Sequence, residues 1–453
     1  MADLSATLES FTAIVAEKAA ALSDYLDAES LPKPTLGEAG HVGYQGESTA
    51  LRKARYDLAR AAKSLQLLAQ GPEDTALALF RSAFDASNIE VLLRFRFFDA
   101  VPLGATAQDE RGISTADLAA KVDLPLGLTE RIVRFAVGNG LFEEPAPGLI
   151  IHSATSAALA RSPALRAVGR LTTGPITDVT VRIADALELQ QAGRNGVTKS
   201  LLTGQSELGQ EEPAFCLAFP PYKSPWELAQ ANPDFAGMMG DYMRHNESTS
   251  RMRLDHLVQA RDWSSLGAAR VVDVGGSLGH ASIALASAMP SATFLVQDVT
   301  AATVEEGRAL VQQQFPDLAP RIAHAQHDFF TPMPAEAAGA DVYLLQWILH
   351  DWTDADAVRI LRGLVPALSK PGARVLISEA VRPETPARLA NTLDEKVVMD
   401  QDVIMLAAHA SKERSVAGFT RLFEEADARF HHVATGGGAN GALRSVLEYE
   451  LRD

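Results

Sequence analysis

Cysteine is almost absent from this 453-residue chain, which contains only Cys216. No disulfide can therefore form within the chain, which suits a reducing compartment and leads us to expect a cytoplasmic protein. The roughly 18 consecutive apolar residues that a membrane-spanning helix needs are also missing. The first ten residues show no basic segment followed by an apolar core, so we expect no secretory signal.

Basic residues are fewer than acidic residues in this chain. The chain has 41 lysines and arginines against 57 aspartates and glutamates, a formal net charge of −16. An acidic surface repels nucleic-acid phosphates and anionic membranes, so neither is expected as a partner. Hydrophobic residues make up 47% and charged residues 22%, which predicts a large globular core and two or three domains.

The first half of the chain is predicted to be mainly helical. Apolar residues recur at helical spacing in three segments, at about 4–26, 50–70 and 75–98. The weakly apolar stretch 36–47, which contains several glycines, is expected to be a loop.

Residues 113–151 have an order of elements that is typical of a winged helix. Ser114, with Asp117 three positions later, resembles a helix start, and an apolar helix is predicted for 128–137. Two strand-like segments, separated by prolines, close the region. A winged helix can bind DNA or serve for packing and dimerisation. We favour the second role, because basic residues here are few and face many acids: Lys121, Arg131 and Arg134 against Asp117, Asp123, Glu130, Glu143 and Glu144.

From Arg270 onward, short β-branched runs alternate with helix-length segments. Strands are expected to begin near residues 271, 293, 322, 342, 375, 432 and 445. This alternation predicts βαβ units and a parallel, doubly wound sheet, and therefore an α/β fold. The expected boundary divides the chain into a helical winged-helix domain, 1–262, and an α/β domain, 263–453.

A glycine cluster follows the first predicted strand of the α/β domain. Asp273 lies in this strand, Gly275, Gly276 and Gly279 come directly after it, and Asp298 lies near the end of the next strand. Glycines at this point let a ligand approach the backbone, and an acid about 20 residues on can bind ribose hydroxyls. The spacing differs from the dinucleotide fingerprint and indicates an adenosyl cofactor without phosphates, such as S-adenosyl-L-methionine (SAM). The alternative is that the glycines form only a turn.

Two later strand ends also carry polar or aromatic residues. Asp328 and Phe329 follow the third strand and could hold an adenine ring, or Asp328 could be a simple helix cap. The apolar run 342–349 leads directly into His350 and Asp351. Because ligands bind beyond the carboxyl ends of parallel strands, the topology favours a functional His350 over a purely structural one.

Several motifs, taken together in this order, resemble one family. They are Val-Val-Asp-Val-Gly-Gly-x-x-Gly at 271–279, Leu-His-Asp-Trp-Thr-Asp at 349–354, Leu-Ile-Ser-Glu at 376–379, Ile-Met-Leu at 404–406 and Lys-Glu-Arg at 412–414. This sequence resembles the SAM-dependent O-methyltransferases of plant caffeic acid, flavonoid and fungal polyketide metabolism. The resemblance covers nearly the whole chain. It implies a winged-helix dimerisation and substrate-lid domain, a Rossmann-like SAM-binding domain and a homodimer.

The resemblance also implies catalytic roles. His350 is expected to be the general base that removes a hydroxyl proton from the acceptor, and Glu379 and Glu413 are expected to orient its ring. The alternatives are a surface acid at the strand end for Glu379 and an exposed charge cluster for Glu413. Asp351 is expected to fix the strand end or to bind cofactor.

The family brackets its aromatic acceptor with two methionines. Met405 matches one of them, and Met243 is the best match for the second, with Met239 nearby and Trp226 as a further lining residue. A thioether is apolar and adaptable, which suits a flat ring. Ordinary core packing is the alternative for these side chains.

Two departures from the plant members favour the fungal polyketide branch. Gln346 stands where plant members often carry lysine, and the chain is longer around 30–50 and 190–215. The expected activity is O-methylation of a phenolic or enolic hydroxyl on a small aromatic, polyketide-like substrate, with no metal. The alternatives are a SAM-binding enzyme repurposed for a pericyclic or dehydration reaction, and a SAM-binding regulator that uses the winged helix.

Overall fold

A computed structural model describes the chain at residues 7–39, 48–105, 111–195, 212–248, 254–384, 393–437 and 444–452. The chain forms two compact units, of which the first contains residues 1–181 and 226–246 and the second 182–225 and 247–453. The units therefore differ from the predicted segments 1–262 and 263–453, because each draws on two stretches of chain. The lengthened regions noted in the sequence fall largely outside the described residues, at 40–47 and 196–211.

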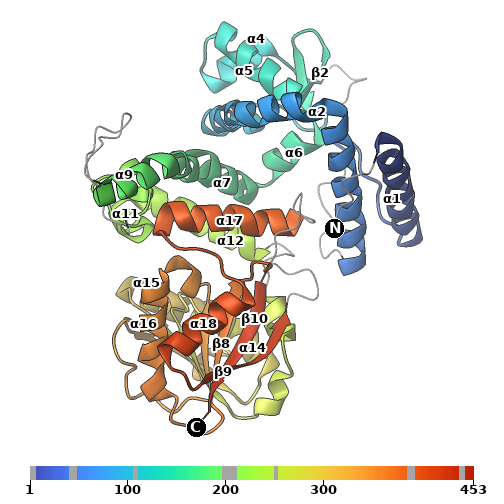
Figure 1. Ribbon diagram of the computed structural model, residues 1–453. Coiled ribbons are helices and arrows are strands. Elements are labelled where there is room, and N and C mark those ends of the chain that lie inside the picture. The colour runs from blue at the N-terminus through green and yellow to red at the C-terminus, as the bar shows by residue number, and fades with distance from the viewer. Residues whose placement is uncertain are drawn as a thin grey trace. The chain divides into compact units, whose positions relative to one another are not determined.

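The first unit begins with a long helical hairpin (Figure 1). Helix α1 spans Leu8–Ala28 and α2 spans Thr49–Arg94, and they pack together through a small core that includes Leu22, Leu26 and Leu51. Helix α2 is kinked at Gly71, whose φ is +72°, directly before Pro72. The kink explains why the sequence predicted two helices here, since proline removes a backbone donor and disrupts the helix.

The predicted winged-helix order of elements is present in the same unit. Its elements are β1 Ile113–Ser114, α4 Thr115–Val122, α5 Leu126–Gly138, β2 Phe142–Ala146 and β3 Leu149–His152. The strands form an antiparallel sheet in the order β1-β3-β2. Ser114 caps α4 as expected, because its hydroxyl accepts the backbone N–H of Asp117 at 3.0 Å.

Shorter helices connect the hairpin, the winged helix and the sheet. They are α3 Phe97–Ala100, α6 Ala154–Arg161, α7 Pro163–Leu171, η1 Thr172–Ile176, α8 Thr177–Thr180, α9 Ile183–Asn195, α10 Phe215–Ala218, α11 Pro225–Ala231, α12 Pro233–Ser248, α13 Asp255–Gln259 and η2 Trp263–Leu266. Across the described residues, no helix combines the length and the apolar character that a bilayer crossing requires.

A seven-stranded sheet organises the second unit (Figure 1). Its strands are β4 Arg270–Val274, β5 Thr293–Asp298, β6 Ile322–Gln326, β7 Val342–Gln346, β8 Arg374–Ala380, β9 Phe430–Gly437 and β10 Arg444–Leu451. The strand order is β6-β5-β4-β7-β8-β10-β9. The first five strands are parallel, whereas β10 runs antiparallel to both β8 and β9, so the sheet is not parallel throughout. Gly437 and Arg444 are too close in sequence for a parallel crossover, which needs about a dozen residues.

Side chains of successive strand residues pack into two separate hydrophobic cores, one on each face of the sheet. On β4, Val271 belongs to one core and Val272 to the other; on β7, Val342 and Tyr343 divide in the same way. Helices α13, α14 and α15 cover the Val271 face, and α16 and α18 cover the opposite one. Each fully buried aliphatic side chain contributes about 1.5–3 kcal/mol, so both faces stabilise the unit.

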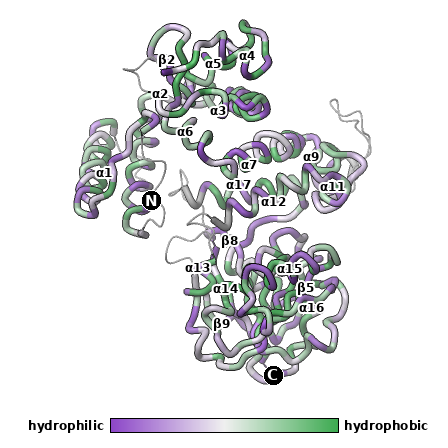
Figure 2. Tube along the Cα trace, turned by 180° about the vertical axis from the view of Figure 1, so that it is seen from behind, coloured by the Kyte–Doolittle hydropathy of each residue, from purple (hydrophilic) through white to green (hydrophobic). Residues whose placement is uncertain are grey.

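Helices α16 and α18 are amphipathic where they cover the sheet, and the tube carries both hydrophilic and hydrophobic colour along α16 (Figure 2). The bounds not yet given are α14 His280–Ala288, α15 Ala301–Gln314, η3 Ala319–Arg321, η4 Leu349–Asp351, α16 Asp354–Leu364, η5 Val365–Ala367, α17 Leu393–His409 and α18 Val416–Ala426. The strand order reverses between β4 and β7, and ligands of doubly wound sheets bind at such a reversal.

Candidate active site

The glycine loop lies directly after β4, beside the reversal in strand order. Gly275 and Gly279 have φ values of +70° and +87°, a region that favours glycine. A Cβ atom on Gly275 would lie 2.6 Å from Cδ1 of Ile348, and one on Gly276 would lie 2.5 Å from Cγ of Asp273. The loop is therefore packed closely against Ile348 and Asp273, and the approach of a ligand to its backbone stays a prediction.

Asp273 lies beneath this loop and is fully buried. Its Oδ2 accepts the hydroxyl of Ser282 at 2.7 Å, whereas its Oδ1 is buried without a hydrogen-bond partner. Burial raises the pKa of this carboxyl to about 6, against the weaker opposing effect of Ser282. A buried acceptor without a partner beside a glycine cradle indicates a place for a donor from a bound molecule.

The other predicted cofactor residues come to the same edge of the sheet. Asp298 is the last residue of β5, and its Oδ1 accepts the backbone N–H of Thr300 at 3.0 Å. Burial raises the pKa of Asp298. Asp328 is exposed and its Oδ1 accepts the N–H of Phe330 at 2.9 Å within a turn, so it is not the helix cap considered as the alternative. Phe329 lies against the loop, with Cε1 3.4 Å from the Cβ position of Gly275.

These residues fit the SAM predicted from the sequence. The glycine loop lies at the carboxyl end of β4, and Asp298, at the end of β5, has carboxylate oxygens that could bind ribose hydroxyls. Phe329 supplies an aromatic surface. The three acids Asp273, Asp298 and Asp328 lie in or just after the strands β4, β5 and β6.

His350 lies in the turn η4, four residues beyond the end of β7, and its side chain is 3% exposed. Its Nδ1 is 2.9 Å from Oε1 of Glu413, whose own side chain is fully buried. Burial lowers the pKa of His350, but the carboxylates of Asp351, Glu379 and Glu413 outweigh it and raise the pKa to about 10. The predicted pair of His350 and Glu413 is thus in direct contact.

Glu379 has a different partner from the one expected. Its Oε1 accepts the backbone N–H groups of Ile348 at 3.1 Å and Leu349 at 2.9 Å, immediately before His350. Glu379 therefore holds the turn that carries the histidine, rather than bonding to its ring. It is fully buried, and burial raises its pKa to about 7 despite the opposing effect of His350. This explains why it is not the surface acid considered as an alternative.

The sequence did not predict that Asp351 and His409 both lie near the ring of His350. Asp351 Oδ1 lies 3.5 Å from Nε2 of His350 and 3.7 Å from Nε2 of His409, at the end of α17. Burial lowers the pKa of His409, against the effect of Asp351. Asp351 therefore faces the candidate catalytic histidine itself, whereas His409, three residues after the Ile-Met-Leu motif, was not singled out from the sequence.

The four predicted acceptor-lining residues fall in both units. Met405 lies on α17 of the second unit and is 4% exposed. Trp226, Met239 and Met243 lie on α11 and α12 of the first unit, where Trp226 is 40% and Met243 39% exposed. Trp226 and Met243 are therefore partly exposed, and the part of all four residues in binding an acceptor stays a prediction.

Comparison with known proteins identifies the family. The family model of the O-methyltransferase domain matches residues 209–429. Over 448 residues the chain is 32% identical to the grayanic acid biosynthesis cluster O-methyltransferase of Cladonia grayi, with 97% of this chain and 87% of that protein covered. The family predicted from the sequence motifs is thus confirmed.

Solved structures share the fold. OxaC, in a complex with S-adenosylhomocysteine (SAH) and oxaline, has a TM-score of 0.72 and 20% identity, covering 98% of this chain and 99% of its own. A pericyclic reaction enzyme has a TM-score of 0.65 and 22% identity, covering 88% and 94%. The α/β class and the SAM cofactor predicted from the sequence are confirmed. The chain belongs to the O-methyltransferase family, and it is a SAM-dependent O-methyltransferase of secondary metabolism.

Proposed function

We propose that this enzyme methylates a phenolic or enolic hydroxyl of a polyketide-like aromatic, with His350 as the general base. The observation that carries the proposal is the buried contact between Nδ1 of His350 and Oε1 of Glu413, beside the reversal in strand order. A histidine fixed through Nδ1 has Nε2 available for the proton of an acceptor, because the two ring nitrogens act separately. Removing the hydroxyl proton of the acceptor at this position favours transfer of the methyl group to the acceptor's oxygen.

The proton follows a short path in this mechanism. When bound, SAM supplies an electrophilic methyl group on a positively charged sulfur. In its neutral form, His350 would take the hydroxyl proton of the acceptor at Nε2, and Glu413 and Asp351 would stabilise the resulting imidazolium. The products are the methyl ether and SAH, with the proton left on His350. A pKa of about 10 for His350 is close to that of a phenol, near 10, so proton transfer between them is nearly balanced.

The acceptor is held in this proposal by apolar side chains. Met405 on α17, which is 4% exposed, is the candidate from the second unit. Thioethers adapt to flat rings. The relative from Cladonia grayi is named for a grayanic acid biosynthesis cluster, which supports an acceptor from secondary metabolism.

We also propose a homodimer formed through the first unit. The second half of α2 exposes four large apolar side chains within one short stretch: Leu77, Leu79, Phe80 and Phe84, with exposed fractions of 38%, 69%, 75% and 61%. Leu77, Phe80 and Phe84 have the spacing of a single helix face. An exposed apolar face of this kind is typical of an interface.

A second candidate function is a pericyclic or dehydration reaction in which SAM is bound without losing its methyl group. It is supported by the likeness in fold to a pericyclic reaction enzyme. The His350–Glu413 contact favours methyl transfer, because a pericyclic rearrangement needs no proton acceptor. Glu413 contacts the ring of His350 and Glu379 accepts the backbone N–H of Leu349 directly before it, which supports a role for His350 in proton removal.

Mass spectrometry of the purified enzyme with SAM and a panel of aromatic polyketides tests this function. We expect a methylated acceptor and SAH to form together, and His350→Ala to abolish both while SAM binding, measured by calorimetry, survives. Glu336→Gln, a surface change in another loop, is the control that should retain activity. Full activity of His350→Ala would contradict the role of His350, and an isomerised or dehydrated product with intact SAM would support the second candidate.

A further inference from the structure

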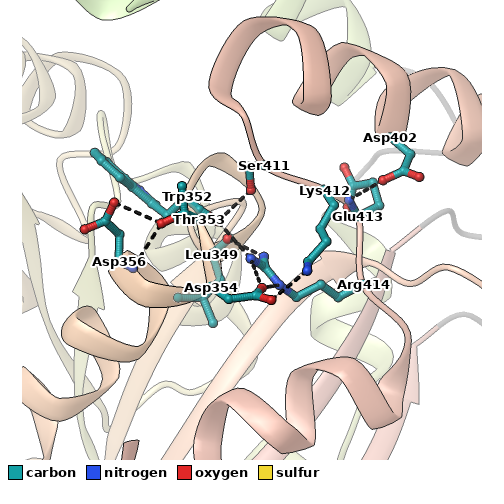
Figure 3. A network of polar contacts seen from close by, with 10 residues as sticks. All are labelled: Leu349, Trp352, Thr353, Asp354, Asp356, Asp402, Ser411, Lys412, Glu413 and Arg414. Atoms are coloured by element: carbon teal, nitrogen blue, oxygen red, sulfur yellow. Dashed lines mark hydrogen bonds and ion pairs between the residues drawn. The ribbon is translucent and has the colours of Figure 1, made fainter. Parts of the chain in front are cut away.

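Arg414 forms a set of contacts around the turn that carries His350 (Figure 3). Its side chain is 2% exposed, although arginine is rarely buried unless it is fully paired. Nη1 donates to the carbonyl of Leu349 at 2.7 Å, and Nη2 donates to the carbonyl of Trp352 at 2.8 Å. These two carbonyls lie on either side of His350 in the chain.

The same turn is held from its other side by Glu379. The carboxylate of Glu379 accepts the N–H groups of Ile348 and Leu349, while Arg414 donates to the C=O groups of Leu349 and Trp352. An anion thus satisfies the backbone donors and a cation satisfies the backbone acceptors of one short turn. Because charge-assisted hydrogen bonds are about twice as strong as neutral ones, this arrangement restricts the position of the turn.

Arg414 is also the residue that follows Glu413. The carbonyl of Arg414 accepts the N–H of Arg382, just beyond β8, at 3.0 Å, and the N–H of Glu413 is held by Asp402 of α17 at 2.7 Å. The backbone beside the carboxylate partner is therefore fixed at two points. The Arg414 side chain then joins this segment to the turn of His350, so one residue connects both members of the pair.

The charge of Arg414 is balanced at a point away from the histidine. Its Nε and Nη2 contact Oδ1 of Asp354 at 3.0 and 2.8 Å, and the other oxygen of Asp354 binds the exposed Lys412 at 2.6 Å. Ser411 adds a hydroxyl donor to the carbonyl of Trp352 at 2.6 Å. A lysine in place of Arg414 has no planar fork and cannot reach two carbonyls and a carboxylate together.

We infer that Arg414 is a positioning residue, which sets the distance between His350 and Glu413 by joining the turn 349–352 to the segment 411–414. The inference rests on the proposed role of His350 as the base for its effect on rate. The inference that Arg414 sets the distance between His350 and Glu413 can be tested without that role, because the titration of His350 reports directly on its contact with Glu413.

The titration of His350 depends on every charged group that faces it. These are Asp351 in its own turn, Glu379 at the end of β8, Glu413 after α17, and His409 on α17. Loss of the Arg414 contacts should let the turn move away from Glu413 in particular. The pKa of His350 should then fall from its raised value toward the ordinary one for histidine, near 6.5.

The experiment uses the full-length enzyme with ¹³C-labelled histidine, in wild-type form and as Arg414→Met, Arg414→Lys and Lys412→Met. The His350 signal is identified by its loss in His350→Gln. We expect both Arg414 variants to lower the pKa of His350 and to reduce kcat, by about 100-fold for Arg414→Met, while the Kd for SAM stays unchanged. Lys412→Met removes only the exposed partner of Asp354 and should leave the titration and kcat as they are.

Thermal unfolding shows which variants are folded. If Arg414→Met does not fold, Arg414→Lys is used for the same measurements. An unchanged His350 titration in a folded Arg414 variant would overturn the inference, even if kcat falls. A lowered His350 pKa in a protein whose His350→Ala form still transfers methyl groups would support the positioning role. Methyl transfer by His350→Ala would contradict the proposed function alone, whereas an unchanged His350 titration would contradict the positioning role of Arg414 alone. The two failures are therefore distinguishable.

Discussion

Nδ1 of His350 and Oε1 of Glu413 lie 2.9 Å apart, with side chains that are 3% and 0% exposed. A buried charged pair of this kind is retained at a cost in desolvation, so its presence is better explained by chemistry than by stability. The pair also controls the protonation of the histidine, because the carboxylates around His350 raise its pKa to about 10. The His350–Glu413 pair, the glycine loop beside Asp273 and the exposed face of α2 each lead to testable predictions.

Replacing Glu413 with glutamine should change the pH dependence of catalysis. With a pKa of about 10 the imidazole holds its proton at neutral pH, so kcat/KM of the wild type should rise as pH increases from 7 toward 10. Glu413→Gln removes one carboxylate and lowers that pKa, which moves the rising limb to lower pH and reduces its maximum. Initial rates between pH 6 and pH 10 test this prediction. An unshifted limb with an unchanged maximum would show that Glu413 does not act on His350.

Asp273→Asn should stabilise the protein at neutral pH and weaken SAM binding. Burial raises the pKa of Asp273 from 3.8 to about 6, so ionisation of Asp273 opposes folding, increasingly from about pH 4 to pH 6 and fully above it. The shift corresponds to roughly 3 kcal/mol, since each pKa unit is about 1.4 kcal/mol. Urea unfolding should show this gain at pH 7 and little of it at about pH 3, where the carboxyl is mostly protonated in both the folded and the unfolded state. A gain of equal size at both pH values would show that the buried charge is not the cause.

The same variant tests the cofactor site. Loss of the carboxylate charge should weaken SAM binding by calorimetry, because a donor of the bound cofactor would lose its charged acceptor at Oδ1. Ser287→Ala, on the same helix as Ser282 but bonded only to a backbone carbonyl, is a matched control. Tighter SAM binding by Asp273→Asn would contradict the assignment of Asp273 to the cofactor.

Gly275→Ala should cost more stability than alanine at another glycine with positive φ. At Gly275 the new Cβ would meet Cδ1 of Ile348 at 2.6 Å, whereas at Gly372, with φ +78°, nothing lies within 4 Å. Backbone strain of about 1–2 kcal/mol is common to both positions, and overpacking adds about 1–3 kcal/mol at Gly275 alone. Denaturant unfolding measures both free energies. Equal losses would show that Ile348 moves aside freely.

The exposed face of α2 predicts an effect on assembly. The double variant Phe80→Ser/Phe84→Ser should shift the protein from dimer to monomer in sedimentation equilibrium, because the two rings are 75% and 61% exposed in the single chain. Arg81→Ser, on the same exposed stretch, is the control that should remain dimeric. A wild type that sediments as a monomer would remove the homodimer from the proposal.

Much of the site could be predicted because its signals are local in the chain. The glycine loop, Asp298 and the His350 turn each follow a strand directly, and parallel strands bring such residues to one edge. Positions of the strands followed from runs of β-branched residues. The reversal of β10 was missed, since alternation of strands and helices does not show the direction of the last strand.

The sequence by itself determined the family, the order of strands and helices and the identity of the polar residues at the sheet edge, because each depends on neighbours within a few positions. Only the tertiary structure decided what those residues contact. His350 and Glu413 are 63 positions apart, and Arg414 is 65 positions from Leu349, whose carbonyl it binds. Glu379 was expected at the imidazole but binds backbone amides. Which donor meets which acceptor depends on sheet register and turn geometry, and no local pattern encodes them.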